Sequence, residues 1–293
     1  SSHWIEMETV RRLLPELSYA LRKGNCGRLG LLGGSAEYTG APYYAAYSML
    51  RLGADLAHVF TPAAAAPVIK SYSPELIVHP HLESVLEWYP RMDGILIGPG
   101  LGREPDAMGI ARKMVETAAA QDTPTVVDAD GLWAVTEALP GIKLSSDFLI
   151  LTPNAVEMDR LAQKVMNEST LGKSSDEISR IASYVAVDIG AHIYAKGPID
   201  IFCCPDGKVH TYNTVGSVRR PGGIGDILSG VLLTLLVWAK KSGQPIDNVA
   251  EAASFLVREC SRRAFEDKGR GMVASDVLAH VAPLIKHIDR SSL

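Results

Sequence analysis

Short apolar runs alternate with longer stretches of mixed polarity between residues 28 and 166. The apolar runs are roughly four to eight residues long and end at Gly, Pro or Asp, as strands buried on both faces do. The stretches between them carry apolar residues at helical spacing. The alternation predicts βαβ units and an α/β fold, a mostly parallel central sheet with helices on both faces. We expect strands at 28–34, 54–61, 75–79, 93–97, 124–128 and 148–151, and helices at 41–53, 63–72, 84–89, 106–121 and 155–166.

The pattern changes after residue 174. Ser174 and Glu177 have the spacing of a capping box, which predicts a helix to about residue 189 and a strand at 191–195 after it. Two further apolar runs, 199–204 and 208–212, flank Pro205-Asp206-Gly207, and this turn chemistry predicts a hairpin.

A helical region closes the chain. We expect helices at 226–241, about 247–267 and about 275–288, the last with Ser275 as its N-cap. Residues 1–24 are polar and lightly helical. Because no internal repeat, low-complexity tract or long linker divides the sequence, we expect one domain over residues 1–293.

A glycine-rich turn precedes the most apolar of these helices. Arg219 and Arg220 lead into the glycines of 222–225, and the turn delivers Asp226 to the first turn of an apolar helix at 227–239. Glycines allow a ligand to approach the backbone, amides at a helix start favour anions, and guanidinium groups suit phosphate oxygens. A carboxylate in such a place suggests a base, and hence phosphoryl transfer to a hydroxyl. The alternative is a plain turn with Asp226 as an N-cap.

Two glycine-rich segments follow predicted strands. Residues 33–42 read as a flexible loop over a ligand, with Pro42 at the start of a helix, or as an ordinary turn. Gly98, Gly100 and Gly102 come directly after the strand at 93–97. Parallel sheets bind ligands at the carboxyl ends of their strands, so this run suits close backbone approach, although glycines also make plain turns.

Charged residues follow three other strands. Asp128 and Asp130 offer paired carboxylates for magnesium–phosphate chemistry, or a turn pivoting on Asp130-Gly131. Asn154 and Glu157 have N-cap-to-N3 spacing, which a capping box explains without any function. Lys196 begins either a ligand-binding segment or a hairpin-entry turn.

A histidine pair lies near the strand at 75–79. His79 and His81 flank Pro80, and a third metal ligand is missing from the neighbouring sequence. We therefore assign no metal to this pair.

Composition narrows the class of ligand. Hydrophobic residues make up 47% and charged residues 21%, the profile of a globular protein with a sizeable core. The formal net charge of −4 gives no electrostatic basis for nucleic-acid or membrane partners. A polyanionic ligand therefore needs a local site such as Arg219 and Arg220.

Cysteine spacing and apolar runs bear on the compartment. The four cysteines form no C-x-x-C pair, which argues against a zinc site or a disulfide framework and fits a reducing compartment. The longest apolar run, 227–239, is too short to span a bilayer. No signal peptide is visible, and the absence of an initial Met leaves open a removed targeting segment. We expect an intracellular protein of the cytoplasm or the mitochondrion.

The run Gly-Ser-x-Arg-Arg-x-Gly-Gly-x-Gly-Asp at 216–226 resembles the anion-hole motif of the ribokinase-like superfamily, most closely its ATP-dependent NAD(P)H-hydrate dehydratase branch. The segments 33–42, 154–157 and 196–200 also match that branch, so the resemblance covers most of the chain. Two positions depart from it. Met158 stands where metazoan-type members have Phe, and Ile224 stands where Gln is frequent.

The resemblance implies site residues and cofactors. Asp226 is implied to be the catalytic base, and Mg²⁺ is implied to bridge the phosphates of ATP, with no ligands assigned. Contacts with the hydrated nucleotide are implied for Gly100, Gly102, Asn154, Ala155, Val156, Glu157, Met158, Asp159, Arg160 and Asp226. Contacts with ATP are implied for Lys196, Gly197, Pro198, Ile199, Asp200, Gly216, Ser217, Val218, Arg219, Arg220, Pro221, Gly222, Gly223, Ile224 and Gly225.

The implied reaction is ATP-driven dehydration of the S form of hydrated NADH or NADPH through a phosphorylated intermediate. The partners are then ATP and the hydrated nucleotide, and a homo-oligomer stays open. Two alternatives remain at this point: a small-molecule kinase of the hydroxyethylthiazole or pyridoxal type, and a catalytically silent nucleotide-binding module. Asp226 and the complete glycine turn argue against the silent module.

Overall fold

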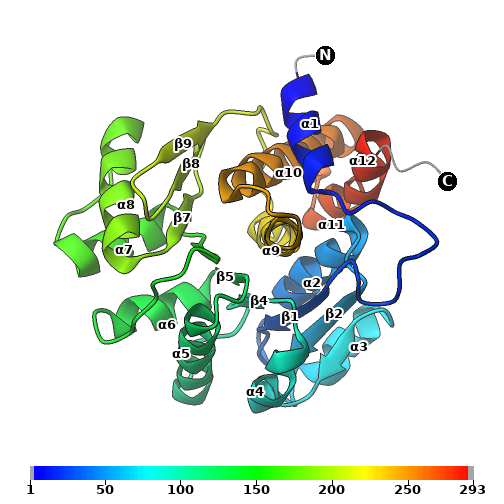
Figure 1. Ribbon diagram of the computed structural model, residues 1–293, viewed down its shortest axis with the longest axis horizontal. Helices are drawn as coiled ribbons and strands as arrows, with labels where there is room; N and C mark the ends of the chain where they lie inside the picture. The colour runs from blue at the N-terminus through cyan, green and yellow to red at the C-terminus, as the bar shows by residue number, and fades with distance from the viewer. Residues whose placement is uncertain (1–2, 290–293) are drawn as a thin grey trace.

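A computed structural model describes residues 3–289, and a nine-stranded sheet runs through them in the order β3-β2-β1-β4-β5-β6-β7-β8-β9. All neighbouring pairs from β3 to β7 are parallel, whereas β7–β8 and β8–β9 are antiparallel. The expected mostly parallel sheet with a late hairpin is therefore confirmed (Figure 1). The strands are β1 (Arg28–Leu32), β2 (Leu56–Phe60), β3 (Ile77–His79), β4 (Gly94–Ile97), β5 (Thr125–Val127), β6 (Leu149–Leu151), β7 (His192–Ala195), β8 (Asp200–Cys203) and β9 (Val209–Tyr212).

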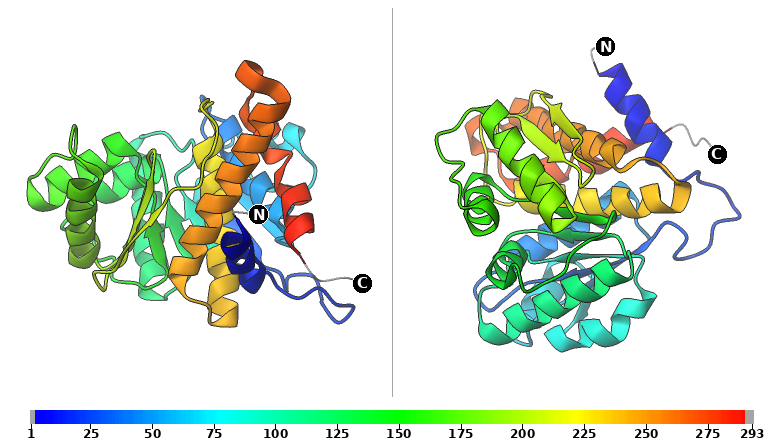
Figure 2. Two further views of the ribbon diagram at one scale, coloured as in Figure 1. Left: turned by 90° about the horizontal axis from the view of Figure 1, so that it is seen from above. Right: turned by 60° about the vertical axis from the view of Figure 1, so that its left-hand side comes forward.

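Helices cover both faces of the sheet (Figures 1 and 2). One face packs against α1 (Trp4–Leu13), α2 (Gly40–Leu52), α3 (Ala66–Tyr72), α9 (Ile224–Ser242), α10 (Ile246–Lys268), α11 (Ala274–Leu278) and α12 (Val281–Ile288). The other face packs against α4 (Val85–Trp88), α5 (Pro105–Ala120), α6 (Asp130–Ala138), α7 (Ala155–Met166) and α8 (Ser175–Ile189).

The central strands supply side chains to both cores. In β4, Leu96 packs in the core with α9, whereas Ile95 and Ile97 pack in the core with α5. Strand β6 alternates in the same way, and all its residues are buried. Burial on both faces explains why these strands read as continuous apolar runs rather than as alternating ones.

Helix α9 lies at the centre of one face, and its residues 227–239 are all buried. It packs closely on α2, since a Cβ at Gly230 would lie 2.2 Å from the carbonyl oxygen of Ala45. Only glycine permits this approach. The helix is therefore fixed at the core, and its first turn, which carries Asp226, is held at the carboxyl edge of the sheet.

Some predicted boundaries are wrong. Helix α6 was not predicted, because Asp130-Gly131 read as a turn, whereas both residues lie in the first turn of the helix. Glycine is needed at position 131 because a Cβ there would lie 2.4 Å from the carbonyl oxygen of Ile97. The helix expected at 275–288 is two helices, α11 and α12, and Val273 rather than Ser275 precedes the first. The break lets residues of both helices pack into the same core.

Smaller differences are at element ends. Only Val85–Trp88 of the stretch 84–89 is α-helical, between two short 3₁₀ turns, and α9 begins at Ile224. Among residues 3–289, none of the helices has both the length and the apolar character that crossing a membrane requires.

Candidate active site

Loops from five neighbouring parallel strands meet at the carboxyl edge of the sheet. The Gly34 amide after β1 donates to the Pro99 carbonyl after β4 (2.9 Å). Asp128, after β5, accepts hydrogen bonds from Thr152 after β6 (2.9 Å) and from Lys196 after β7 (3.1 Å). The motifs at 33–42, 98–103, 128, 152–157 and 196 are thus parts of one edge, where parallel sheets bind their ligands.

A buried ion pair organises the centre of this edge. Lys196 Nζ lies 3.1 Å from Asp128 Oδ1, and Ser229 of α9 donates to Asp128 Oδ2 at 2.6 Å. Burial lowers the pKa of Lys196, but Asp128 first, and then Glu157 and Asp226, outweigh burial and raise this pKa above its ordinary value. Lys196 is therefore a permanent cation among three carboxyl groups.

Asp226 has the most altered carboxyl group of the site. Burial first, and then the negative charge of Asp128, raise its pKa to about 8, while Lys196 opposes the shift. A carboxylate with a pKa near neutrality is basic enough to accept a proton from a hydroxyl in a transition state. The sequence placed Asp226 in the first turn of a helix, and the structure confirms that position.

The glycine turn forms the start of α9. Gly223, the N-cap, has φ +101°, a left-handed conformation that favours glycine. In the described part of the chain, no side chain caps this end of the helix. The first amides of a helix lack acceptors within it, so those of residues 224–226 are donors available to an anion. A Cβ at Gly225 would lie 3.4 Å from Lys196 Nζ, which places the cation beside the turn.

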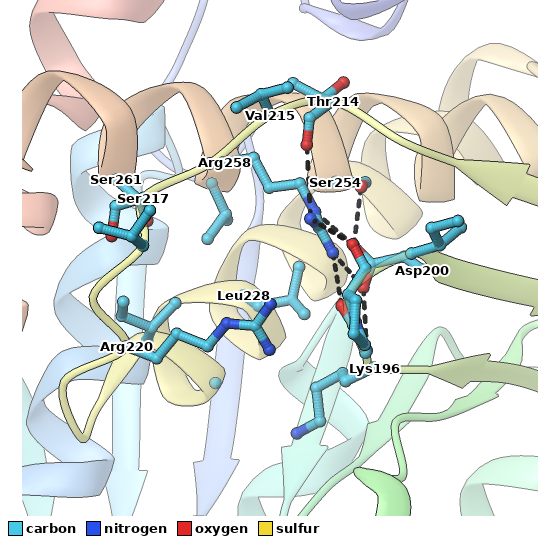
Figure 3. A pocket seen from close by; sticks show the side chains of 18 of the residues that line it. Lys196, Asp200, Thr214, Val215, Ser217, Arg220, Leu228, Ser254, Arg258 and Ser261 are labelled. Atoms are coloured by element: carbon cyan, nitrogen blue, oxygen red, sulfur yellow. Dashed lines mark hydrogen bonds and ion pairs between the residues drawn. The ribbon is translucent and has the colours of Figure 1, made fainter.

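A cavity of about 680 Å³ opens beside this turn. Its lining includes most of the residues predicted to bind ATP, namely 196–200, 216–221, Ile224 and Gly225, together with Asn154 and Ala155. In Figure 3, Arg220 and Lys196 point into the same space from opposite walls. Gly222 and Gly223 do not line the cavity. Sequence reasoning missed Asn213, Thr214, Val215, Leu228, Ser254, Val257, Arg258 and Ser261.

Asp200 lies at the cavity but its carboxylate is already occupied. It accepts hydrogen bonds from Tyr194 (2.6 Å), Ser254 (2.8 Å) and Arg258 (3.0 Å). The predicted contact between Asp200 and ATP therefore cannot use its carboxylate without breaking this network. The signal for Arg258 in the sequence is a charged residue at helical spacing among the apolar and small residues 250, 254, 257 and 261.

The two glycine loops near β1 and β4 contact each other. Gly100 has φ +68° and Gly102 has φ +76°. A Cβ at Gly100 would lie 3.1 Å from the carbonyl oxygen of Tyr38, so the loops at 33–42 and 98–103 touch. Asp130 accepts the Gly102 amide at 2.8 Å and pairs with Arg103 at 3.3 Å. Asp130 thus holds the second loop, whereas Asp128 bonds to Lys196 and Ser229, so the two carboxylates have different partners.

The segment 154–160 divides into parts. Asn154 and Glu157 form the predicted capping box, with two bonds of 2.9 Å. Burial first raises the pKa of Glu157, while its bond to the Asn154 amide opposes that shift. Met158 and Asp159 are buried, and Asp159 accepts bonds from residues 163, 169 and 170, so neither lines the cavity.

Arg160 and Arg103 both contact the ring of Trp133, outside the lining of the cavity. The Cζ of Arg160 lies 4.5 Å from the centre of the Trp133 ring, and the Cζ of Arg103 lies 3.9 Å from the same ring. Arg160 has no hydrogen bond or ion pair with another of the residues that the structure describes. Its guanidinium donors are therefore available to a ligand.

The side chains at the carboxyl edge of the sheet include few that could ligate a divalent metal ion. Residues 3–289 contain no cluster of three or more acidic, histidine or cysteine side chains that could bind a metal ion. His79 bonds to His58 (3.0 Å) rather than pairing with His81. Mg²⁺ usually keeps several waters and binds phosphates plus one or two carboxylates. Glu157 fits that requirement, since it forms no ion pair with a lysine or arginine among residues 3–289.

Comparison with known proteins identifies the family. A family model described as NAD(P)H-hydrate dehydratase matches residues 29–283. The ATP-dependent (S)-NAD(P)H-hydrate dehydratase of Caenorhabditis elegans is 40% identical over 292 residues, covering 97% of this chain and 95% of that protein. A ribokinase-like superfamily protein from Enterococcus faecalis has the same fold, with a TM-score of 0.78 at 20% identity over 97% of this chain and 95% of its own.

A further solved structure is similar in fold. It is the ADP/ATP-dependent NAD(P)H-hydrate dehydratase of Bacillus subtilis, co-crystallised with ATP and Mg²⁺. Its TM-score is 0.73 at 24% identity, over 95% of this chain and 97% of that chain. The ribokinase-like fold expected from the sequence is thus confirmed, and on the family model and the relative at 40% identity, the chain belongs to the NAD(P)H-hydrate dehydratase family.

Proposed function

We propose that this protein uses ATP to dehydrate the S form of hydrated NADH or NADPH, regenerating the reduced nucleotide. The observation that carries the proposal is Asp226, a carboxyl group with a pKa of about 8 between the Lys196–Asp128 pair and a glycine turn. The adjoining cavity of about 680 Å³ falls within the size range of small-molecule sites, roughly 300–1,000 Å³.

The residues at the carboxyl edge of the sheet can each take a role in the phosphoryl transfer. Asp226 accepts the proton of the ring hydroxyl, and the hydroxyl oxygen attacks the γ-phosphorus of ATP, releasing ADP. The amides at the start of α9, with Lys196 and Arg220, stabilise the charge on the transferring phosphoryl group. Mg²⁺, held by the phosphates with Glu157, would neutralise part of the phosphate charge when bound.

The second half of the reaction needs little from the protein. The C–O bond to the new phosphate breaks as the lone pair of the ring nitrogen forms a C=N bond. Loss of a proton from the adjacent ring carbon restores the dihydropyridine, and inorganic phosphate leaves. The net change is loss of water from the substrate and hydrolysis of ATP to ADP and phosphate.

Fold alone also suits a small-molecule kinase, since fold does not fix function. The names and 40% identity of full-length relatives favour dehydration. Incubating the protein with NADH hydrate, ATP and Mg²⁺ tests the choice. We expect the absorbance of the dihydropyridine to appear with one ADP and one phosphate for each molecule formed. A stable phosphorylated product would instead identify a kinase, and no turnover would identify a silent module.

Asn154→Asp separates helix capping from a role in the site. Asp and Asn cap helices equally well, so we expect the melting temperature to stay within error of wild type. Asn154 lines the cavity, and Glu157 is bonded to it, so a new negative charge should repel phosphate and lower kcat/KM by about tenfold. Full activity in a stable Asn154→Asp protein would leave capping as the only role of residues 154–157.

Substitutions of Arg219 and Arg220 should affect ATP affinity and thermal stability differently. Arg219 Nε donates to the Met272 carbonyl at 3.2 Å, whereas Arg220 points into the cavity (Figure 3). Arg220→Ala should weaken ATP binding by more than about tenfold, because a charge-assisted hydrogen bond contributes roughly 1.5–3 kcal/mol. Arg219→Ala should have the smaller effect on ATP affinity and the larger effect on melting temperature. Calorimetric titration and thermal melts of both variants measure this, and the reverse ranking would contradict it.

A further inference from the structure

We propose that Arg258 of α10 is a positioning residue that holds together the two loops which form opposite parts of the nucleotide cavity. This inference rests on the proposed function, because it assigns the cavity to ATP. One loop, 196–199, joins β7 to β8, and the other, 213–223, joins β9 to α9. Residues of both loops line the cavity, and both loops precede Arg258 by more than 30 residues in the sequence.

The guanidinium of Arg258 makes four hydrogen bonds and an ion pair. Nε donates to Asp200 Oδ2 (3.0 Å), and one terminal nitrogen lies 2.9 Å from Asp200 Oδ1 and donates to the Gly197 carbonyl (2.8 Å). The other terminal nitrogen donates to the carbonyls of Pro198 (3.0 Å) and Thr214 (3.4 Å). A rigid five-donor fork can make such a set of bonds, whereas lysine has three donors on one atom.

The stem of the side chain supports the second loop as well. A Cβ at Gly216 would lie 3.5 Å from both Cβ and Cγ of Arg258, so the loop rests on the aliphatic part of the side chain. In Figure 3, Arg258 descends from α10 between Thr214 and Asp200. One residue thus contacts the β9–α9 loop through its stem and its fork, and the β7–β8 loop through its fork alone.

Asp200 fixes the fork in turn. Its buried carboxylate accepts bonds from Tyr194 of β7 and Ser254 of α10, in addition to those from Arg258. Tyr194 and Ser254 are buried, so the anchor belongs to the core rather than to the surface. The two loops are therefore held by a network that begins inside the protein and ends at carbonyls of the cavity lining.

Loss of Arg258 should affect the binding of ATP and not the chemical step. In the described structure Arg258 and Asp200 form no hydrogen bond or ion pair with Asp226 or Asp128. Lys196, at the start of the 196–199 loop, has its own bonds to Asp128 and to the Pro153 carbonyl, so the base and the central ion pair should persist. Loops released from Arg258 would sample other positions and would have to be reordered by ATP. Loss of Arg258 should therefore raise the KM for ATP while leaving kcat at saturating ATP, and the KM for the hydrated nucleotide, nearly unchanged.

The test uses Arg258→Lys and the double variant Arg258→Met/Asp200→Asn. Arg258→Lys keeps the charge beside Asp200 but cannot reach all the carbonyls, and the double variant avoids a buried unpaired carboxylate. In both variants we expect the KM for ATP to rise by between about tenfold and 10²-fold, the scale of a misplaced binding group. The kcat at saturating ATP should stay within about twofold, and amides of 213–218 should exchange hydrogen faster until ATP is added.

Arg262→Met is the matched control. Arg262 lies one turn further along α10 and pairs with Glu259 and Glu266. Within residues 3–289 its side chain has no hydrogen bond to either loop, and it does not line the cavity. It should leave both KM values unchanged. A KM for ATP within twofold of wild type in the folded double variant would overturn the inference. Failure of the wild-type protein to bind ATP in calorimetry would instead overturn the proposed function, so the two failures are distinguishable.

Discussion

Asp226→Asn is expected to lower turnover by about 10²-fold or more, the usual scale for loss of a general base. Asparagine has nearly the same size and cannot accept the hydroxyl proton. Binding of ATP should persist, because the amides, Lys196 and Arg220 are unchanged. In the wild-type protein, kcat/KM should fall as pH drops below about 8, since Asp226 is then protonated in the free enzyme.

The same substitution should raise thermal stability. Burial raises the pKa of Asp226 to about 8 from an ordinary value near 4, so between these pH values the folded protein binds a proton that the unfolded chain has lost. The wild-type free energy of unfolding therefore falls as pH rises through this window. Asparagine does not titrate, so the melting temperature of Asp226→Asn should exceed that of wild type by a margin that grows from pH 5 to pH 8.

Two measurements check this pair of expectations: initial rates with NADH hydrate, and thermal melts at pH 5 and pH 8. Asp276→Asn is the control for removing a carboxylate elsewhere, since Asp276 caps α11 through the Val273 amide and lies outside the cavity lining. Its turnover should match that of wild type. Near wild-type turnover in Asp226→Asn would remove the residue from the mechanism. A melting difference that is independent of pH would contradict the raised pKa.

Much of the architecture could be predicted because it depends on local patterns. The apolar runs that became β4, β5 and β6 are buried on both faces, and that burial is visible in the sequence as uninterrupted hydrophobicity. The glycine turn before Asp226 was predicted for a similar reason: its glycines and arginines lie within one short segment. Helix α6 escaped prediction because Gly131 is required by close packing on β4, not by a turn.

The parts of the site that were missed depend on long-range contacts. Arg258 meets Gly197 and Asp200 across 61 and 58 residues, and Lys196 meets Asp128 across 68 residues. No local spacing encodes these pairs. Sequence patterns also suggested that Asp128 and Asp130 act together. In the structure Asp128 forms an ion pair with Lys196, whereas Asp130 accepts a hydrogen bond from the Gly102 amide.

Lys196→Met should have the other large effect, because it removes a cation whose pKa is raised by Asp128, Glu157 and Asp226 together. We expect a loss of about 3 kcal/mol in the free energy of unfolding, the low end for a broken buried pair, since Asp128 keeps its bonds from Ser229 and Thr152. Turnover should fall by at least 10²-fold as phosphate loses a charged partner. Denaturant melts and initial rates measure the two losses.

The pH profile distinguishes the electrostatic role of Lys196 from simple loss of packing. Lys196 lowers the pKa of Asp226, whereas Asp128 raises it. In Lys196→Met the residual activity should therefore need a higher pH than in wild type. In the double variant Lys196→Met/Asp128→Asn the two changes oppose each other, so stability and the pH profile should return toward wild type while ATP binding stays weak. An unshifted profile in the single variant would contradict coupling between Lys196 and the base.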